Sequence, residues 1–156
     1  MSREIGPKAV DIAAGLYQLK ARLFVSSGRT EQAEEFFEQS ITLLKSLDTP
    51  NSRSLQNVLV EGADLQRSLK RYSRAEKMYS EALALATDPS ETGQAAKAVL
   101  LQNLAGLYRD QGLLERSLDA YRETLKLKER LLPENSSSIA ITLTSLGDIY
   151  RLTGRY

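Results

Sequence analysis

Three arginines recur at intervals of 42 residues and are the side chains in this sequence best suited to hold a charged ligand. They are Arg67, Arg109 and Arg151, and Asp64 and Asp148 stand three residues before two of them. A guanidinium group donates paired hydrogen bonds to carboxylates and phosphates, so three of them could bind an acidic or phosphorylated peptide. Alternatively, each arginine pairs with an acidic neighbour in its own or the next helix and covers apolar surface with its aliphatic stem.

The composition excludes several classes of catalytic and metal site. The 156 residues include no histidine and no cysteine. Most zinc and copper sites, and most Ser-His or Cys-His nucleophile pairs, need at least one of these residue types. The carboxylates of EQAEEFFEQ, residues 31–39, could in principle do acid-base work. They are better explained as the solvated face of a helix, so we expect no enzyme, no metal and no cofactor.

Charge and hydropathy exclude two further classes of partner. The 21 basic and 20 acidic residues are mixed along the chain and leave a net charge of +1. A nucleic-acid-binding surface needs a basic stripe, and none is present. No run approaches the roughly 18 apolar residues of a membrane span, and the N-terminal residues lack the apolar block of a signal peptide. We therefore expect neither a nucleic-acid nor a membrane partner, and a cytoplasmic location.

Helical periodicity, interrupted by prolines and turn residues, divides the chain into elements. No stretch alternates as a β-strand would, so the predicted fold class is all-α. Short and longer loops alternate between the elements. Seven helices are predicted, over residues 8–27, 30–47, 52–69, 72–87, 91–111, 114–132 and 137–153.

The elements repeat with a period of 42 residues. The stretch GLYRDQGLLERSLDAYRETL, residues 106–125, shows the repeating positions most clearly. Tyr108 aligns with Phe24 and Tyr150, Gly112 with Gly28 and Gly154, Ser117 with Ala33 and Ala75, and Tyr121 with Phe37 and Tyr79. The glycines can end a helix in the left-handed conformation without steric cost, and the aromatic residues are expected in the core. Because Lys70 replaces the glycine and Gln66 the aromatic residue, we expect the second repeat to have the least regular turn.

This order of residues resembles the tetratricopeptide repeat. Small residues in the first helices, Ala21, Ala63, Ala105 and Gly147, precede the aromatic residue and the glycine, and a second helix follows with a small and an aromatic residue. The repeat is similar to the kinesin light chain type in its 42-residue period and in the residue pattern of LLQNLAGLYRDQGLLERSLDAYRETLKLKERLLPENSSSIAITLTSLGDIYRLTGRY. The resemblance implies an α-solenoid of antiparallel helix pairs, a single array over residues 1–156. Its repeats would cover about 8–49, 50–91 and 92–135, with the first helix of a fourth over 136–154.

In such an array the first helices line a concave groove, and side chains that point away from both neighbouring helices are the expected partner-binding residues. Asn103 could hydrogen-bond the backbone of an extended peptide, as the resemblance implies. The predicted groove residues are Gln18, Arg22 and Val25 in the first repeat, Asn57, Val60, Glu61, Asp64 and Arg67 in the second, Gln102, Asn103, Gly106 and Arg109 in the third, and Thr144, Ser145, Asp148 and Arg151 in the fourth.

The predicted function is a non-catalytic adaptor that binds a segment of a partner protein in this groove. Two alternatives remain. The last helix would expose Leu143, Leu146, Ile149 and Tyr150, so the chain could be a fragment of a longer array or could form homo-oligomers through this end. It could also be a regulatory or sensor segment of a larger protein.

Overall fold

The computed structural model describes residues 6–47 and 52–154. Within these ranges every regular element is an α-helix, and no strand occurs. The helices are α1 (Pro7–Ser26), α2 (Thr30–Lys45), α3 (Ser52–Ser68), α4 (Tyr72–Ala84), α5 (Glu91–Asp110), α6 (Leu114–Leu131) and α7 (Ser137–Leu152). The all-α prediction is confirmed, and each helix ends within three residues of its predicted end.

The largest difference lies at the end of α4, which stops at Ala84 rather than continuing to residue 87. Pro89 follows closely and disfavours helical backbone at Asp88. Asp88 instead accepts a hydrogen bond from the Ser90 backbone N–H at 2.9 Å. The Ser90 hydroxyl accepts one from the Gly93 N–H at 3.2 Å and thereby caps α5.

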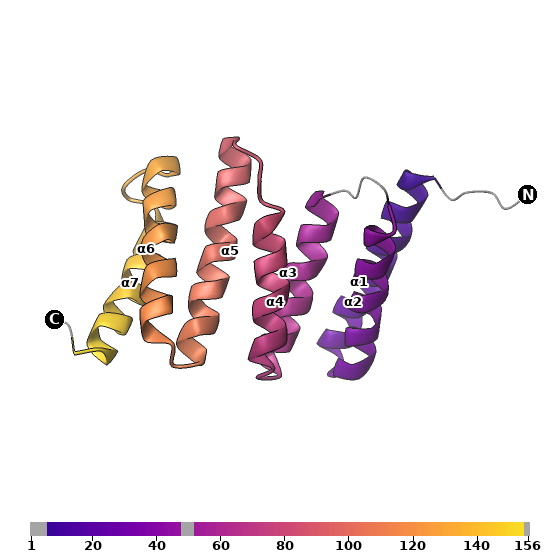
Figure 1. The fold of residues 1–156 in the computed structure, drawn as a ribbon, viewed down its shortest axis with the longest axis horizontal. Coiled ribbons are helices and arrows are strands. Elements are labelled where there is room, and N and C mark those ends of the chain that lie inside the picture. The colour runs from indigo at the N-terminus through magenta and orange to yellow at the C-terminus, as the bar shows by residue number, and fades with distance from the viewer. Residues whose placement is uncertain (1–5, 48–51, 155–156) are drawn as a thin grey trace, which may run out of the picture. The chain divides into compact units, whose positions relative to one another are not determined.

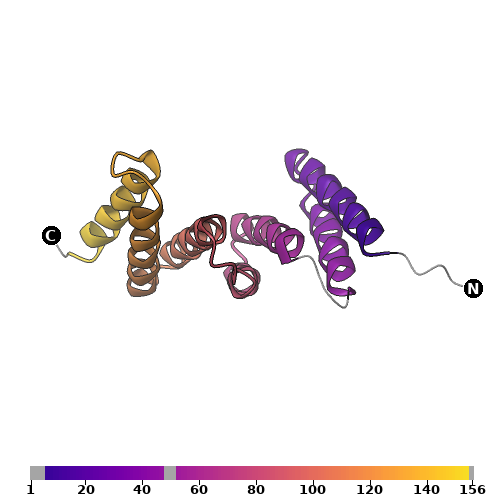
Figure 2. The same ribbon diagram turned by 90° about the horizontal axis from the view of Figure 1, so that it is seen from above.

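The helices form two compact units, Met1–Leu85 and Ala86–Tyr156. In the first unit, α1 pairs with α2 and α3 with α4 as antiparallel hairpins, and α2 packs against α3 (Figures 1 and 2). In the second unit, α6 packs against both α5 and α7. The division of the chain into a single array with the repeat boundaries given above stays a prediction.

The four tight turns within the repeats share one backbone geometry. Gly28, Gly112 and Gly154 have φ values of 74°, 75° and 68°, and Lys70 has a φ of 58°. The Lys70 N–H donates to the Arg67 carbonyl at 2.9 Å, as the Gly112 N–H does to the Arg109 carbonyl. The expectation of a less regular turn in the second repeat is therefore wrong. These backbone hydrogen bonds outweigh the cost of about 1 to 2 kcal/mol for a left-handed residue other than glycine.

Most of the repeating small and aromatic positions form the core, as predicted, but Phe24 and Tyr150 at the ends of their first helices are only half-buried. Ala21, Ala63 and Ala105 are fully buried, and the aromatic residues of the second helices are buried beside them. Gly147, at the corresponding position of α7, is exposed. The buried aromatic residues are Phe37, Tyr79 and Tyr121.

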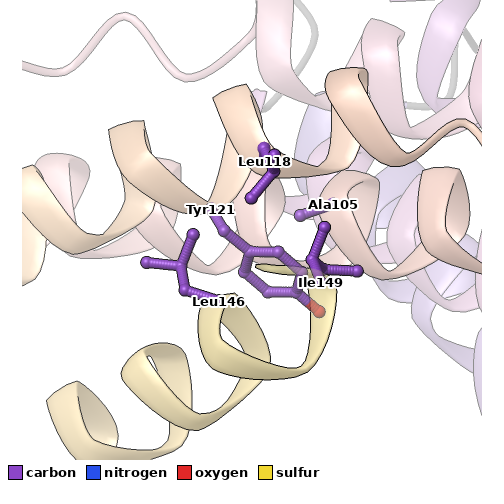
Figure 3. Close-up of a cluster of buried hydrophobic side chains, with 5 residues drawn as sticks. All are labelled: Ala105, Leu118, Tyr121, Leu146 and Ile149. Carbon is purple, nitrogen blue, oxygen red and sulfur yellow. The ribbon is translucent and has the colours of Figure 1, made fainter. Parts of the chain in front are cut away.

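The predicted bare strip on α7 is wrong for two of its four residues. Leu146 and Ile149 are buried, and they belong to one cluster of buried side chains with Tyr121 and Leu118 of α6 and Ala105 of α5 (Figure 3). The physical reason is that α6 covers this side of α7 with Tyr121 and Leu118. Leu143 is exposed, as expected, whereas Tyr150 is half-buried against the same cluster.

Candidate protein-interaction site

One position in the last turn of each first helix holds either an arginine or a valine. The carbonyl oxygens of Arg67, Arg109 and Arg151 accept the N–H of the left-handed residue three positions on, at 2.9, 2.9 and 3.3 Å. In α1 the same bond runs from Gly28 to Val25, at 3.1 Å. An arginine here complements the negative end of the helix dipole. Val25 instead places an apolar side chain at the end of α1.

Val25 lines a cavity of about 380 Å³ in the first unit. This volume lies within the usual range for ligand pockets. Its apolar lining comes from α1, α2 and α3 through Val25, Phe37 and Leu65. The remaining lining residues are polar: Arg22, Ser26, Glu61, Asp64 and Ser68. Three of the predicted groove residues thus meet at this cavity together with Val25.

A bidentate ion pair connects two helices at the rim of the cavity. Nε of Arg22 in α1 donates to Oε2 of Glu61 in α3 at 2.7 Å, and the Nη2 of the same arginine donates to Oε1. Two parallel hydrogen bonds of this kind fix the orientation of both side chains. The pair therefore holds the mouth of the cavity in one arrangement and leaves no net charge there.

A second polar contact at the cavity involves a buried tyrosine. The hydroxyl of Tyr79, from α4, donates to Oδ1 of Asp64. Partial burial raises the pKa of Asp64, although the hydrogen bond from Tyr79 and the charge of Arg67 act in the opposite direction. Burial, together with the neighbouring carboxylate, also raises the pKa of Tyr79 well above its usual range, so this phenol stays protonated and remains a donor. Arg67 also interacts with the Tyr79 hydroxyl, so its guanidinium is engaged within its own unit.

The two arginines of the second unit have looser acidic neighbours. Nη2 of Arg109 lies 3.6 Å from Oδ1 of Asp110, and Nη2 of Arg151 lies 3.6 Å from Oδ1 of Asp148. Partly exposed ion pairs at this distance contribute about 0 to 1 kcal/mol. Each guanidinium therefore keeps hydrogen-bonding capacity for another group.

Two predicted groove residues of the third repeat serve the helix packing instead. Gly106 is buried. Oε1 of Gln102 accepts a hydrogen bond from Nζ of Lys128, which also donates to Thr142 at 2.9 Å and to the Ser138 carbonyl at 3.2 Å. Burial lowers the pKa of the Lys128 ammonium group. Gln102 thus helps to satisfy a buried lysine between α5, α6 and α7, which the repeat pattern did not indicate.

The other predicted residues keep some exposed surface. Asn57 and Thr144 are exposed, and Gln18, Val60, Asn103 and Ser145 are half-buried. The hydroxyls of Thr144 and Ser145 donate to the carbonyls of Ala140 and Ile141, at 2.9 and 3.0 Å. Because both hydroxyl hydrogens are used in this way, the two oxygens can only accept hydrogen bonds from a partner.

The deeper lining of the cavity was not predicted from the sequence. Phe37 and Leu65 belong to core positions, and Ser26 and Ser68 lie at helix ends. One signal could have located the cavity, namely that valine replaces the recurring arginine in the first repeat. Across residues 6–47 and 52–154, no three acidic side chains gather as a metal site would require. In the same ranges, no helix combines the length and apolar character needed to span a bilayer.

Comparisons with known proteins agree with this geometry. Sequence profiles of the tetratricopeptide repeat match residues 14–43 and 94–156, together more than half of the chain. A search of curated protein sequences finds no match.

Solved structures show the same fold. The crystal structure of BtubC (BKLC) from P. vanneervenii is similar with a TM-score of 0.81 and 23% identity, over 98% of this chain and 60% of that one. A candidate kinesin light chain from Podosopora anserina with nearly identical TPR-like repeats is similar with a TM-score of 0.73 and 15% identity, over 96% of this chain and 69% of that one. A form of the latter with a single substitution is similar with a TM-score of 0.72 and 16% identity, over 99% of this chain and 71% of that one.

The chain thus spans about 60% of the length of the BtubC chain. The profile matches, the helical hairpins with their repeated turn and the kinesin light chain-like neighbours lead to one assignment. The chain belongs to the tetratricopeptide repeat family, has the α-solenoid fold of the kinesin light chain type, and is in general terms a protein-interaction scaffold.

Proposed function

We propose that the chain is a non-catalytic adaptor that binds a segment of a partner protein along its first helices, with the cavity beside Val25 as the anchor. The observation that carries this proposal is the cavity itself, with an apolar lining and a rim of side chains that already pair with one another. An apolar side chain of the bound segment would enter between Val25, Phe37 and Leu65. The internally paired rim favours a segment without strong net charge at this point.

The arginines of the second unit support a further contact in the same proposal. The side chains of Arg109 and Arg151 are 39% and 69% exposed, and the acidic neighbour of each lies at a loose 3.6 Å. Acidic residues of a segment bound to the second unit would satisfy the remaining donors of these arginines. Asn103 would hydrogen-bond the backbone of the segment.

The anchor can be tested by placing an arginine in the cavity. A peptide is first selected from a random displayed library against the full chain, and its dissociation constant is measured by fluorescence anisotropy. Val25→Arg introduces the residue that the other three first helices hold at this position, so folding should be kept. Loss of one buried apolar contact of about 1.5 to 3 kcal/mol should weaken binding by at least about tenfold.

Two controls separate the cavity from general surface effects. Val25→Ala keeps the cavity apolar and should change the affinity much less. Leu113→Arg places the same charge at an apolar residue of similar exposure, 39% against 42% for Val25, and should leave the affinity unchanged. Equal affinities for wild type and Val25→Arg would refute the anchor.

The three recurring arginines are tested with the same peptide. If Arg67, Arg109 and Arg151 bind acidic residues, replacing all three by alanine should weaken binding, and more so at low salt. Unchanged affinity would remove these arginines from the site and leave the cavity as the whole of it. We also propose a cytoplasmic location, which cell fractionation would check.

A further inference from the structure

Helix α1 has a second apolar face that none of the described residues of the first unit, 6–47 and 52–85, covers. Ile12, Leu16, Leu19 and Leu23 are 58% to 67% exposed. The opposite face of α1, which includes Val10, Ala14 and Ala21, is buried. A helix that is apolar on two opposite faces is normally packed on both.

The repeat register identifies what kind of surface this face is. Leu16 and Leu23 occupy the positions that Val58 and Leu65 occupy in α3, 42 residues later. Those two residues are 0% and 5% exposed, in a helix that packs against the preceding hairpin of the same unit. The corresponding pair in α7, Thr142 and Ile149, is fully buried as well. The exposed face of α1 therefore corresponds to a helix-packing interface.

We propose that a second copy of this chain covers the face, with the two α1 helices packed antiparallel about a twofold axis. The four apolar residues follow one another at steps of four, three and four, which is the spacing of a coiled-coil seam. With the axis between residues 17 and 18, Leu16 meets Leu19 of the second copy and Ile12 meets its Leu23. Each apolar residue then has an apolar counterpart, as a twofold interface requires.

Charge favours the antiparallel orientation. Lys20 and Arg22 flank the seam in the C-terminal half of α1. Antiparallel packing brings them to the level of Gly15 and Ala13 of the second copy, which are small and uncharged. Parallel packing would place Lys20 and Arg22 at the level of Lys20 and Arg22 of the second copy. It would also align the two helix dipoles, which repel in that orientation.

The size of the seam sets the expected strength. From Ile12 to Leu23 the helix rises about 17 Å, so one helix pair buries less than the about 800 Å² per partner of a standard interface. We expect a weak dimer, with a dissociation constant of roughly 10 to 100 μM. The cavity residues of the proposed peptide site are not part of the seam, apart from Arg22 at its flank.

Sedimentation equilibrium of the full chain over a wide concentration range tests the dimer. Wild type should shift from monomer to dimer, and Leu16→Glu with Leu23→Glu should weaken association by at least about a hundredfold. Both positions are exposed, so circular dichroism should show an unchanged fold. Ile141→Glu with Leu152→Glu, at exposed apolar residues of α7, is the matched control and should associate like wild type.

Two results would overturn the proposal. One is a wild-type chain that stays monomeric up to about 1 mM. The other is a dimer that survives the two changes in α1, or is lost with the two in α7. Neither result affects peptide binding in the cavity, which is measured separately.

Orientation is measured with a single spin label. Because the chain has no cysteine, Lys8→Cys provides one unique site near the start of α1. Antiparallel helices place the two labels roughly 30 Å apart, and parallel helices about 10 Å apart. A short distance would overturn the antiparallel arrangement.

Discussion

At the scale of single residues, four positions with left-handed backbone form the sharp turns that follow the first helices. Three of them are glycines, and the fourth is Lys70, with a φ of 58°. Its turn has the same pair of backbone hydrogen bonds as the turn at Gly112: the Arg71 N–H donates to the Gln66 carbonyl at 2.9 Å, as the Leu113 N–H does to the Tyr108 carbonyl at 2.8 Å. The side chain of Lys70 is tolerated at this position rather than required by it.

Replacing Lys70 by glycine should therefore stabilise the protein. Relief of the left-handed strain is expected to raise the free energy of unfolding by about 1 kcal/mol, and Gly112→Ala should lower it by a similar amount. Urea denaturation followed by circular dichroism measures both. Lys70→Ala removes the charge but keeps the Cβ atom, so it should give no gain. A Lys70→Gly protein no more stable than wild type would contradict the argument.

At the scale of elements, close backbone approaches decide where helices can begin. Gly93 lies in the first turn of α5, and a Cβ atom added there would lie 2.2 Å from the carbonyl oxygen of Asp88. Gly62 in α3 is also tightly packed, but its added Cβ would meet only the terminal methyl group of Met78, at 2.4 Å. A backbone carbonyl in a capped turn cannot move away, whereas the end of a methionine side chain can.

The same substitution should accordingly have different effects at the two glycines. Gly93→Ala is expected to lower the free energy of unfolding by about 2 kcal/mol, because the start of α5 must shift. Gly62→Ala should be close to neutral, since the better helix propensity of alanine, about 1 kcal/mol, offsets the displacement of Met78. Thermal unfolding of the two variants side by side makes the comparison. Equal losses would show that crowding at Asp88 is not the cause.

At the scale of the whole molecule, the ionisable groups determine how stability depends on pH. The chain has no histidine and no cysteine, so none of its side-chain types ordinarily titrates between about pH 6 and 9. The carboxylate of Glu34 in the first unit has several polar contacts. It accepts a hydrogen bond from Gln66 at 2.5 Å and one from Arg71, and it lies 3.6 Å from Arg74. Burial alone would raise the pKa of Glu34, but these donors and cations together hold it below its ordinary value.

Stability should therefore fall in acid, and Glu34 should account for part of the fall. A lowered pKa in the folded state stabilises the protein above the ordinary glutamate pKa of about 4.3, and this stabilisation is lost as the pH drops through the folded value. Glu34→Gln should cost about 1 to 3 kcal/mol at pH 7 and less at pH 3.5. Urea midpoints at both pH values measure this.

The control is a neighbouring glutamate on the same helix. Glu35 is exposed and contacts Gln39 within α2, so Glu35→Gln should change the stability little at either pH. A gap between wild type and Glu34→Gln that is the same at both pH values would contradict the assignment.

Much of the fold could be predicted from the residues alone. Seven helices follow from periodicity and turn residues, and the buried positions of Ala21, Ala63 and Ala105 follow from the repeat. These features depend on contacts that recur in every hairpin, so each copy of the repeat supplies the same evidence. The candidate site was less predictable because its residues are not repeated. Val25 stands where the other three first helices have arginine, and it is one of the residues that line the cavity.

The sequence by itself determined the helices, their turns and the residues each hairpin buries, because these are local and repeated interactions. Only the tertiary structure decided which polar residues face a partner. It showed Gln102 bound to the buried Lys128, Leu146 and Ile149 covered by α6, and Arg22 paired with Glu61 across the mouth of a cavity. The physical reason is that a side chain in a repeat position has a predictable direction, but its contacts depend on non-repeated neighbours from other helices.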